Sequence, residues 1–493
     1  MSQNPHKEAM PAPGIPAKNY FSAPMAKQKK ERKVLPDITI TDISSEGMGI
    51  ARVEGKVIFV EKAMPGDVVD VEVHKSKKSW AEGVISTLKK ASDLRVKPEC
   101  QHFGVCGGCK WQHIPYAQQL GFKKKIVADA FERIGKVSFP ELPEVLGCEN
   151  NFFYRNKLEF AFTDRKWLTE EEIKSGQSFE QRNALGFHVP GSFSGVIDVE
   201  KCWLQPDPSN EIRLAVKQFA LDNGYTFFNL KEQHGLLRNL MVRITAIGEI
   251  LVLVSFFEND TEKIEALLNF IADRFPQITS LQFVVNSKRN DTIYDQELKT
   301  FKGKDHILEQ LGDYKFKVGA KSFFQTNSNQ AKVLYDITKE FAGLKKEDVV
   351  YDLYTGVGSI ALYVSGECKR VVGVEQIEAA IADAKENAKL NGVENCSFYA
   401  GDVRMVLNPD FIATNGKPDV VITDPPRAGM HEDVVKTLLQ LAAPKIVYVS
   451  CNPATQARDL QLLSEKYEVK RVQPVDMFPH TTHIENVAEL HLK

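Results

Sequence analysis

The sequence has no long apolar run. Its hydrophobic stretches fall short of the roughly 18 residues that a membrane-spanning helix requires, so we expect no membrane segment. Residues 1–33 also lack the short apolar core of a secretory signal peptide. With 43% hydrophobic and 26% charged residues, the composition is typical of a globular protein. We therefore expect a cytoplasmic protein, and its 493 residues predict roughly two to four domains.

A strong net charge is missing as well. The formal net charge is −2, which excludes a uniformly basic coat protein for nucleic acid. Basic residues still cluster at 27–33, 75–78 and 123–125, where they could follow a phosphate backbone. A solvated surface is the simpler explanation of such runs. Residues 1–34, rich in proline, alanine and lysine, are expected to form a disordered basic tail.

Cysteine is scarce, with eight in the chain, but three of them crowd into Cys100-x5-Cys106-x2-Cys109. In a cytosolic protein this pattern favours metal binding over disulfides. Glycines within the run would let the loop wrap a metal group and leave backbone N–H groups free to bond sulfur. A fourth ligand is needed, for which Cys148 and Cys202 are the candidates. The spacing alone does not choose between zinc and an iron–sulfur cluster.

The hydrophobic pattern changes twice along the chain. Between residues 36 and 90, short β-like runs broken by glycines predict a small β-barrel. Residues 91–310 mix strand-like runs with an amphipathic helix at 261–275. From about residue 320, apolar strands alternate with helices, which predicts an α/β fold with a doubly wound parallel sheet. The four strands expected there are 349–353, 371–374, 420–423 and 445–450.

The run from Val349 to Gly358 predicts a buried strand that enters a glycine turn. Such a turn brings backbone N–H groups close to a ligand at the start of a helix. Glu375 ends the next strand, where a carboxylate can accept from both hydroxyls of a ribose. By itself this loop fits a dinucleotide-dependent enzyme as well as a methyltransferase.

Two further acidic residues favour the methyltransferase. Asp402 follows the next expected strand, where a nucleobase amino group could be met. Asp424 ends the strand after that and opens Asp424-Pro425-Pro426-Arg427, a rigid loop over the pocket. This arrangement is similar to a nucleic-acid methyltransferase site, and a dehydrogenase has no evident use for it.

Cys451 follows the strand 446–450 and should lie on the carboxyl edge of the sheet, where ligands bind. A lone cysteine is more often a small buried side chain, but the turn at Asn452-Pro453 and the nearby cofactor motifs favour a nucleophile. A thiolate that adds to C6 of uracil makes C5 nucleophilic enough to accept a methyl group, and a base must then remove the C5 proton. Glu485 is the candidate base. His480 and His483 lack a third partner for a metal site.

With these residues in view, the chain resembles the iron–sulfur RNA uracil-5 methyltransferases of bacteria over nearly all of its length after residue 35. The motifs that carry the resemblance are the three-cysteine run, Phe324-Gln325-Thr326-Asn327, Asp352-Leu353-Tyr354-Thr355-Gly356, Asp424-Pro425-Pro426-Arg427, Ser450-Cys451-Asn452-Pro453 and His483-Ile484-Glu485.

The resemblance implies a set of cofactors and site residues. A 4Fe-4S cluster would be held by Cys100, Cys106, Cys109 and Cys202, since Cys202 matches the fourth position better than Cys148. Cys451 would be the nucleophile and Glu485 the proton acceptor. S-adenosyl-L-methionine would be bound by a further set of residues, which comprises Gln325, Tyr354, Glu375, Asp402 and Asp424.

The resemblance also implies a domain order and a substrate. An OB-like TRAM barrel (35–90) would precede a mixed α+β central RNA-binding domain with the cluster (91–312) and a class I methyltransferase domain (313–493). The expected substrate is 23S ribosomal RNA, with tRNA as the alternative, and no obligate protein partner is evident, so we expect a monomer. The segment 164–184 looks longer than usual, which leaves the target uridine open.

Two other functions fit the motifs less well. A cytosine-5 RNA methyltransferase usually carries a cysteine in the Asp-Pro-Pro loop, where this chain has Arg427. A non-catalytic RNA-binding or iron–sulfur structural protein would have no need of both Cys451 and Glu485.

Overall fold

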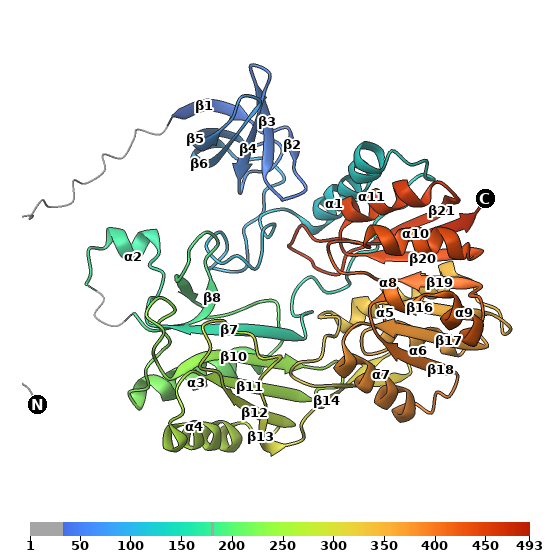
Figure 1. Cartoon of the computed structure of the whole chain (residues 1–493). Helices are drawn as coiled ribbons and strands as arrows, with labels where there is room; N and C mark the ends of the chain where they lie inside the picture. The colour runs from blue at the N-terminus through green and yellow to red at the C-terminus, as the bar shows by residue number, and fades with distance from the viewer. Residues whose placement is uncertain (1–32, 179–181) are drawn as a thin grey trace, which may run out of the picture.

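The computed structural model describes residues 33–178 and 182–493 (Figure 1). The expected disordered tail, apart from its last two residues, lies outside the described part of the chain. Four sheets follow one another along the described part of the chain: a small N-terminal sheet, a central mixed sheet, a two-stranded sheet and a C-terminal sheet flanked by helices. Within the described residues, no helix combines the length and the apolarity that crossing a membrane would demand.

The N-terminal sheet closes into a small barrel. Its six strands are arranged in the order β1-β5-β6-β4-β3-β2. The two edge strands, β1 and β2, are consecutive in the chain, so the sheet returns on itself around buried Ile38, Ile58 and Val71. The strands are β1 Val34–Thr39, β2 Asp42–Ile43, β3 Gly49–Val53, β4 Lys56–Glu61, β5 Val68–Ser76 and β6 Trp80–Lys90.

A loop that contains the three clustered cysteines leaves the barrel and leads to α1 (Tyr116–Ala130), which continues as the π-helical turn η1 (Phe131–Gly135). Val127 and Phe131 are buried in the same apolar cluster as the C-terminal sheet. Figure 1 shows α1 beside α11 (Pro453–Leu463). This early segment is thus packed against the last part of the chain.

The central sheet has the order β13-β12-β11-β10-β7-β8-β9 and is antiparallel except where β11 pairs with β12. Helices α3 and α4 pack against it in a single apolar cluster. The short helix α2 begins with a capping box in which Thr169 and Glu172 exchange hydrogen bonds. The elements are β7 Lys157–Thr163, α2 Glu170–Lys174, β8 Ala184–His188, β9 Val196–Asp198, α3 Ser209–Asp222, β10 Leu237–Ile244, β11 Ile250–Phe256, α4 Thr261–Arg274, β12 Ser280–Val285 and β13 Lys299–Gly303.

The C-terminal sheet has the order β18-β17-β16-β19-β20-β22-β21, with helices on both faces. The chain runs outward from β16 to β18 and then returns to β19 on the other side of β16. This reversal creates the crevice in which α/β sheets bind ligands. Before this sheet, β14 Ile307–Leu311 and β15 Tyr314–Val318 pair with each other as a separate two-stranded sheet. The strands of the C-terminal sheet and the helices around it are α5 Ser328–Ala342, β16 Val349–Leu353, α6 Ser359–Ser365, β17 Arg370–Glu375, α7 Glu378–Leu390, β18 Cys396–Ala400, α8 Val403–Val406, α9 Pro409–Asn415, β19 Val420–Thr423, α10 Glu432–Leu441, β20 Lys445–Ser450, β21 Tyr467–Val475 and β22 Glu485–Leu492.

The expectation of a parallel sheet is correct from β18 to β20 and wrong at the other edge. There, β22 runs antiparallel to both β20 and β21. The physical reason is the connection: β21 and β22 are joined by a loop, residues 476–484, and not by a crossover helix, so they form a hairpin.

Candidate active site and cysteine cluster

The carboxyl ends of the parallel strands bring three predicted residues to one edge of the sheet. Tyr354 follows β16, Asp424 follows β19 and Cys451 follows β20. Glu485 reaches the same edge from the opposite direction because it is the first residue of antiparallel β22. The register pairs Ser450 with Asn486, so the residues one step further, Cys451 and Glu485, lie next to each other at the end of the ladder.

The glycine turn after β16 has an open backbone. Gly356 and Gly358 adopt left-handed conformations with φ of 54° and 81°. Tyr354 is left-handed too, at φ 65°, which is rare for an aromatic residue and marks a strained functional turn. The carboxylate of Glu375 accepts hydrogen bonds from the N–H groups of Gly356 (3.2 Å) and Ile377 (3.0 Å). Glu375 therefore lies directly beside the turn, as the sequence predicts.

Asp402 and Gln325 occupy the outer parts of this region. Asp402 caps α8 and pairs with the guanidinium of Arg404, which lowers the pKa of the carboxyl to about 2. Asp402 also acts electrostatically on Tyr354, so the two are near neighbours. Gln325 lies in the segment before α5, and its carbonyl accepts from the side chain of Asn156 at 2.9 Å. That bond ties the cofactor half of the molecule to the central sheet.

The edge of the sheet holds the buried carboxyl group of Glu485, the half-buried carboxyl group of Asp424 and a thiol. Burial, and then the nearby Asp424, raise the pKa of Glu485 from 4.5 to about 8, against the opposing effect of Arg427. Burial, followed by repulsion from Asp352, raises the pKa of Asp424 to about 7. Burial is also the main reason that the pKa of Cys451 rises to about 12, with Glu485 and Asp424 adding to it and Arg427 opposing. A carboxyl group with a pKa near neutrality can both accept and release a proton.

Arg427 is a site residue whose role was not assigned from the sequence. Its guanidinium lies 3.0 Å from Nδ1 of His483, and its carbonyl accepts from Asn452 at 3.0 Å. It favours the ionised forms of both Cys451 and Glu485. The signal was present in the Asp-Pro-Pro-Arg motif, but only the structure shows that the loop turns this cation toward the thiol.

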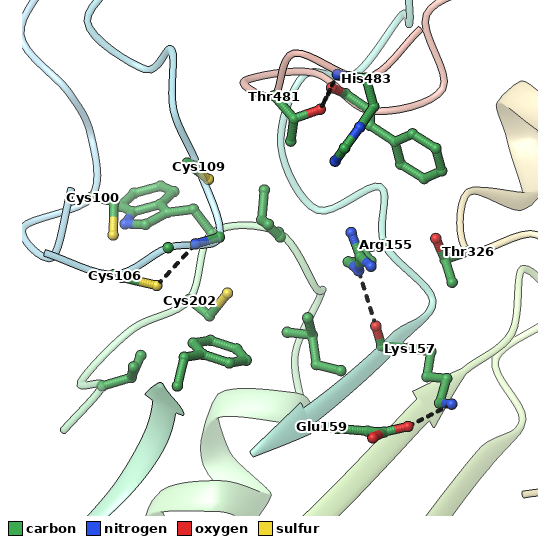
Figure 2. A pocket seen from close by; sticks show the side chains of 18 of the residues that line it. Cys100, Cys106, Cys109, Arg155, Lys157, Glu159, Cys202, Thr326, Thr481 and His483 are labelled. Atoms are coloured by element: carbon green, nitrogen blue, oxygen red, sulfur yellow. Dashed lines mark hydrogen bonds and ion pairs between the residues drawn. The ribbon is translucent and has the colours of Figure 1, made fainter. Parts of the chain in front are cut away.

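The four predicted metal ligands come together. Cys100, Cys106, Cys109 and Cys202 all line one cavity of about 590 Å³ between the cysteine loop and the central sheet. Figure 2 shows them grouped at one end, with Thr481 and His483 at the other. The cavity thus leads from the cysteines to the active-site loop. Its walls also carry five basic side chains: Lys110, Arg155, Lys157, Lys201 and Arg243.

Comparisons with known proteins identify the family of this chain. The model of the tRNA (uracil-5-)-methyltransferase family matches residues 244–492, and the TRAM domain model matches residues 28–85. A relative from Bacteroides thetaiotaomicron, described as an uncharacterized RNA methyltransferase, is 52% identical over 454 residues, or 92% of this chain and 100% of the relative. An RNA methyltransferase from Chlorobaculum tepidum is 38% identical over 462 residues, covering 92% and 95%.

This chain belongs to the tRNA (uracil-5-)-methyltransferase family. The solved tRNA (uracil-54, C5)-methyltransferase of Pyrococcus abyssi, in complex with S-adenosyl-L-homocysteine, is 30% identical with a TM-score of 0.71 and covers 92% of this chain and 99% of its own. The protein is an S-adenosylmethionine-dependent RNA uracil-5 methyltransferase with a class I methyltransferase fold and an N-terminal TRAM domain.

In this methyltransferase, backbone N–H groups point at the cysteine sulfurs. Gly108 donates to Cys106 at 3.5 Å, His102 and Phe103 act on Cys100, and Leu204 and Gln205 act on Cys202. Such bonds stabilise thiolates in iron–sulfur sites. Cys148 is engaged elsewhere, with its sulfur 3.0 Å from the carbonyl of Asp476.

Among the described residues, the structure shows no compact metal site at these cysteines. A tetrahedral zinc ion, with Zn–S bonds of about 2.3 Å, needs its sulfur ligands closely spaced. Across residues 33–178 and 182–493, no three His, Cys, Asp or Glu side chains are gathered closely enough to hold one ion. The 4Fe-4S site that the resemblance implies therefore stays a prediction.

Proposed function

We propose that this enzyme methylates C5 of a uridine in 23S ribosomal RNA, with Cys451 as the nucleophile and Glu485 as the base that removes the C5 proton. The observation that carries the proposal is the placement of these two residues side by side at the ligand edge of the sheet, through the β20–β22 register. The four-cysteine group supports the ribosomal substrate, because the bacterial enzymes that the chain resembles combine such a group with ribosomal RNA.

A uridine in tRNA is the second candidate substrate. The similarity to the Pyrococcus abyssi tRNA (uracil-54, C5)-methyltransferase over 92% of the chain favours it. Both candidates use the same chemistry and differ only in the RNA that the TRAM barrel and the central sheet must hold.

The reaction begins when the sulfur of Cys451 bonds to C6 of a uracil that has left its base stack. The electron pair of the C5–C6 double bond would then form a bond from C5 to the methyl group of S-adenosylmethionine, and the bond from that methyl group to the sulfonium sulfur would break, which releases S-adenosylhomocysteine. Glu485 accepts the proton from C5, the double bond re-forms, and the bond between C6 and sulfur breaks. Thiolate is regenerated and 5-methyluridine is released.

We expect five side chains near the crevice to hold the cofactor. Glu375 has a carboxylate next to the glycine turn for the ribose hydroxyls. Asp402 would meet the adenine amino group after releasing Arg404. Tyr354 would pack against the adenine ring, and Gln325 and Asp424 would flank the methionine part of the cofactor and the target uracil.

We further propose that Cys100, Cys106, Cys109 and Cys202 hold a 4Fe-4S cluster, which braces the RNA-binding cavity, since methyl transfer requires no electron. The chain would then divide into a TRAM barrel (35–90), a central RNA-binding domain (91–312) and a methyltransferase domain (313–493), and act as a monomer in the cytoplasm. Iron and sulfide analysis of anaerobically purified protein tests the cluster, and equal iron and sulfide with no zinc is expected.

The thiol mechanism is tested with transcripts of 23S ribosomal RNA and tRNA that contain 5-fluorouridine. Because fluorine cannot leave C5 as a proton, the wild-type enzyme should form a stable covalent adduct with its true substrate. Cys451→Ala should form none, whereas Cys396→Ala, outside the site, should behave as wild type. If the wild-type enzyme forms an adduct with neither RNA, the mechanism is contradicted. If one RNA is trapped, that RNA is the substrate.

A further inference from the structure

The loop of residues 476–484 ends at the catalytic base and is held by unusual contacts at His480. It connects β21 to β22 and also carries His483, the partner of Arg427. His480 is 5% exposed and has a left-handed backbone with φ 64°. A buried histidine in this conformation is strained, so the surrounding contacts must hold it there.

The cysteine loop binds the backbone of His480 directly. The N–H groups of Lys110 and Trp111 both donate to the carbonyl of His480, at 2.8 and 3.0 Å. Lys110 is the residue after Cys109. The cysteine loop is therefore hydrogen-bonded, just after its third cysteine, to the 476–484 loop that leads to the base.

The fourth cysteine reaches the ring of His480 by a second route. Cys202 is followed by Trp203, whose ring contacts Phe152 edge-on with centroids 5.8 Å apart. Phe152 in turn stacks on the imidazole of His480 at 4.5 Å. Both segments that contribute cysteines thus meet at a single residue of the base-bearing loop.

The alternative is that His480 is an ordinary core residue. Gln119 on α1 bonds both the N–H (2.9 Å) and Nδ1 (3.1 Å) of His480, as expected for a well-packed side chain. Nε2 of His480, however, is buried without a partner among the described residues. A strained backbone and an unpaired buried polar atom each lower the stability of the folded protein. An apolar side chain with an unstrained backbone would have neither cost. The site therefore favours positioning over packing alone.

We propose that His480 is a positioning residue that links the cysteine loop to the catalytic base Glu485. Order in the cysteine loop holds His480, and His480 holds the 476–484 loop so that Glu485 and His483 face the target uracil. When the cysteine loop loses its order, the thiol can still add to the base, but the C5 proton is no longer removed. This inference rests on the proposed function of Cys451 and Glu485.

The first experiment measures two chemical steps separately: addition of the thiol to the base, and release of the methylated product. The proteins compared are the wild type, His480→Ala and Phe152→Leu. The matched control is His431→Ala, at the exposed N-cap of α10. RNA with 5-fluorouridine reports addition, and RNA with ordinary uridine reports release of 5-methyluridine. We expect the first two variants to form the 5-fluorouridine adduct at the wild-type rate. On ordinary uridine they should release product at least 10-fold more slowly and accumulate a denaturation-resistant adduct.

His480→Asn, which tolerates the left-handed backbone and can bond Gln119, should recover part of the release rate. Unchanged release in both His480→Ala and Phe152→Leu, or an equal loss of addition and release, would overturn the proposal. If the wild type itself forms no adduct, the proposed function fails instead.

The second experiment measures the link without using activity. Amide hydrogen exchange is compared between the wild type, Cys109→Ser, Cys202→Ser and the buried control Cys368→Ser. The reporters are the N–H groups of His480, bonded to Gln119, and of Thr481, bonded to Phe478. Cys109→Ser and Cys202→Ser should exchange at least 10-fold faster than the wild type at these amides and at the wild-type rate in β18. Cys368→Ser should match the wild type throughout. Equal protection of these amides in all four proteins would refute the link.

Discussion

Replacing Glu485 by glutamine is expected to stabilise the protein while it abolishes turnover. Glu485 is buried beside Asp424, and these two effects raise its pKa from 4.5 to about 8 although Arg427 opposes them. The folded state therefore binds this proton more tightly than the unfolded state does. Between pH 4.5 and 8 the folded state holds more protons, so the free energy of unfolding falls as the pH rises through this range.

The size of the effect follows from the same shift. At about 1.4 kcal/mol for each pKa unit, the rise to about 8 corresponds to up to about 5 kcal/mol of lost stability above pH 8. Glutamine has nearly the same shape and no charge, so Glu485→Gln should match the wild type near pH 4.5 and exceed its stability increasingly up to pH 8. Denaturation by urea of the ligand-free protein at pH 5 and at pH 8.5 measures the difference.

Glu489, four residues further along β22, provides a matched control. Burial raises its pKa, but hydrogen bonds from Arg471 and His491 outweigh this and hold the pKa below its usual value. Glu489→Gln should therefore destabilise the protein at pH 8.5, the opposite sign. If Glu485→Gln is no more stable than the wild type at pH 8.5, burial and repulsion by Asp424 do not raise the pKa of Glu485 as described.

Three further outcomes are expected. Arg427→Gln removes the cation that lowers the pKa of Cys451. Adduct formation with 5-fluorouridine RNA should therefore slow about 10-fold at pH 7 and recover at higher pH. An unshifted pH profile would exclude this role. Glu375→Ala should weaken binding of S-adenosylhomocysteine by about 10-fold or more in calorimetry, through the lost charged hydrogen bonds; unchanged affinity would place the ribose elsewhere. Lys123→Met removes the ammonium group that lies 2.6 Å from the buried carboxylate of Asp476. The free energy of unfolding, measured with urea, should fall by about 3–5 kcal/mol. A second change, Asp476→Asn, should restore part of this loss.

The sequence predicts best the elements whose signal is local. The strands at 349–353, 420–423 and 445–450 have the bounds expected for continuous apolar runs. The residues that follow these strands lie at the predicted edge, because every strand of a parallel sheet has its carboxyl end there. Cys451 and Asp424 could therefore be placed before the structure was known.

Contacts between distant segments have no such signal. Glu485 is beside Cys451 only because β22 is antiparallel, and the pattern of β21 and β22 alone does not reveal their direction. The packing of α1 on the last sheet, and the bonds from Lys110 and Trp111 to His480, join residues several hundred positions apart. Such contacts depend on the shapes of the packed surfaces and on which polar groups still need a hydrogen-bond partner. Both are set only when the chain is folded.

The charges at the sheet edge also impose an order on the proposed reaction. Glu485 and Cys451 each disfavour ionisation of the other, so the thiol ionises most easily while Glu485 is protonated and Arg427 is close. When sulfur bonds to C6 it becomes a neutral thioether and its negative charge passes to the enolate of the uracil. Methyl transfer from the sulfonium to C5 then neutralises the enolate, so that the negative charge that would repel the Glu485 carboxylate is gone. Glu485 can then lose its proton to solvent and accept the one from C5. The base thus becomes competent after the nucleophile has been used, which prevents a thiolate and a carboxylate from facing each other in a buried site.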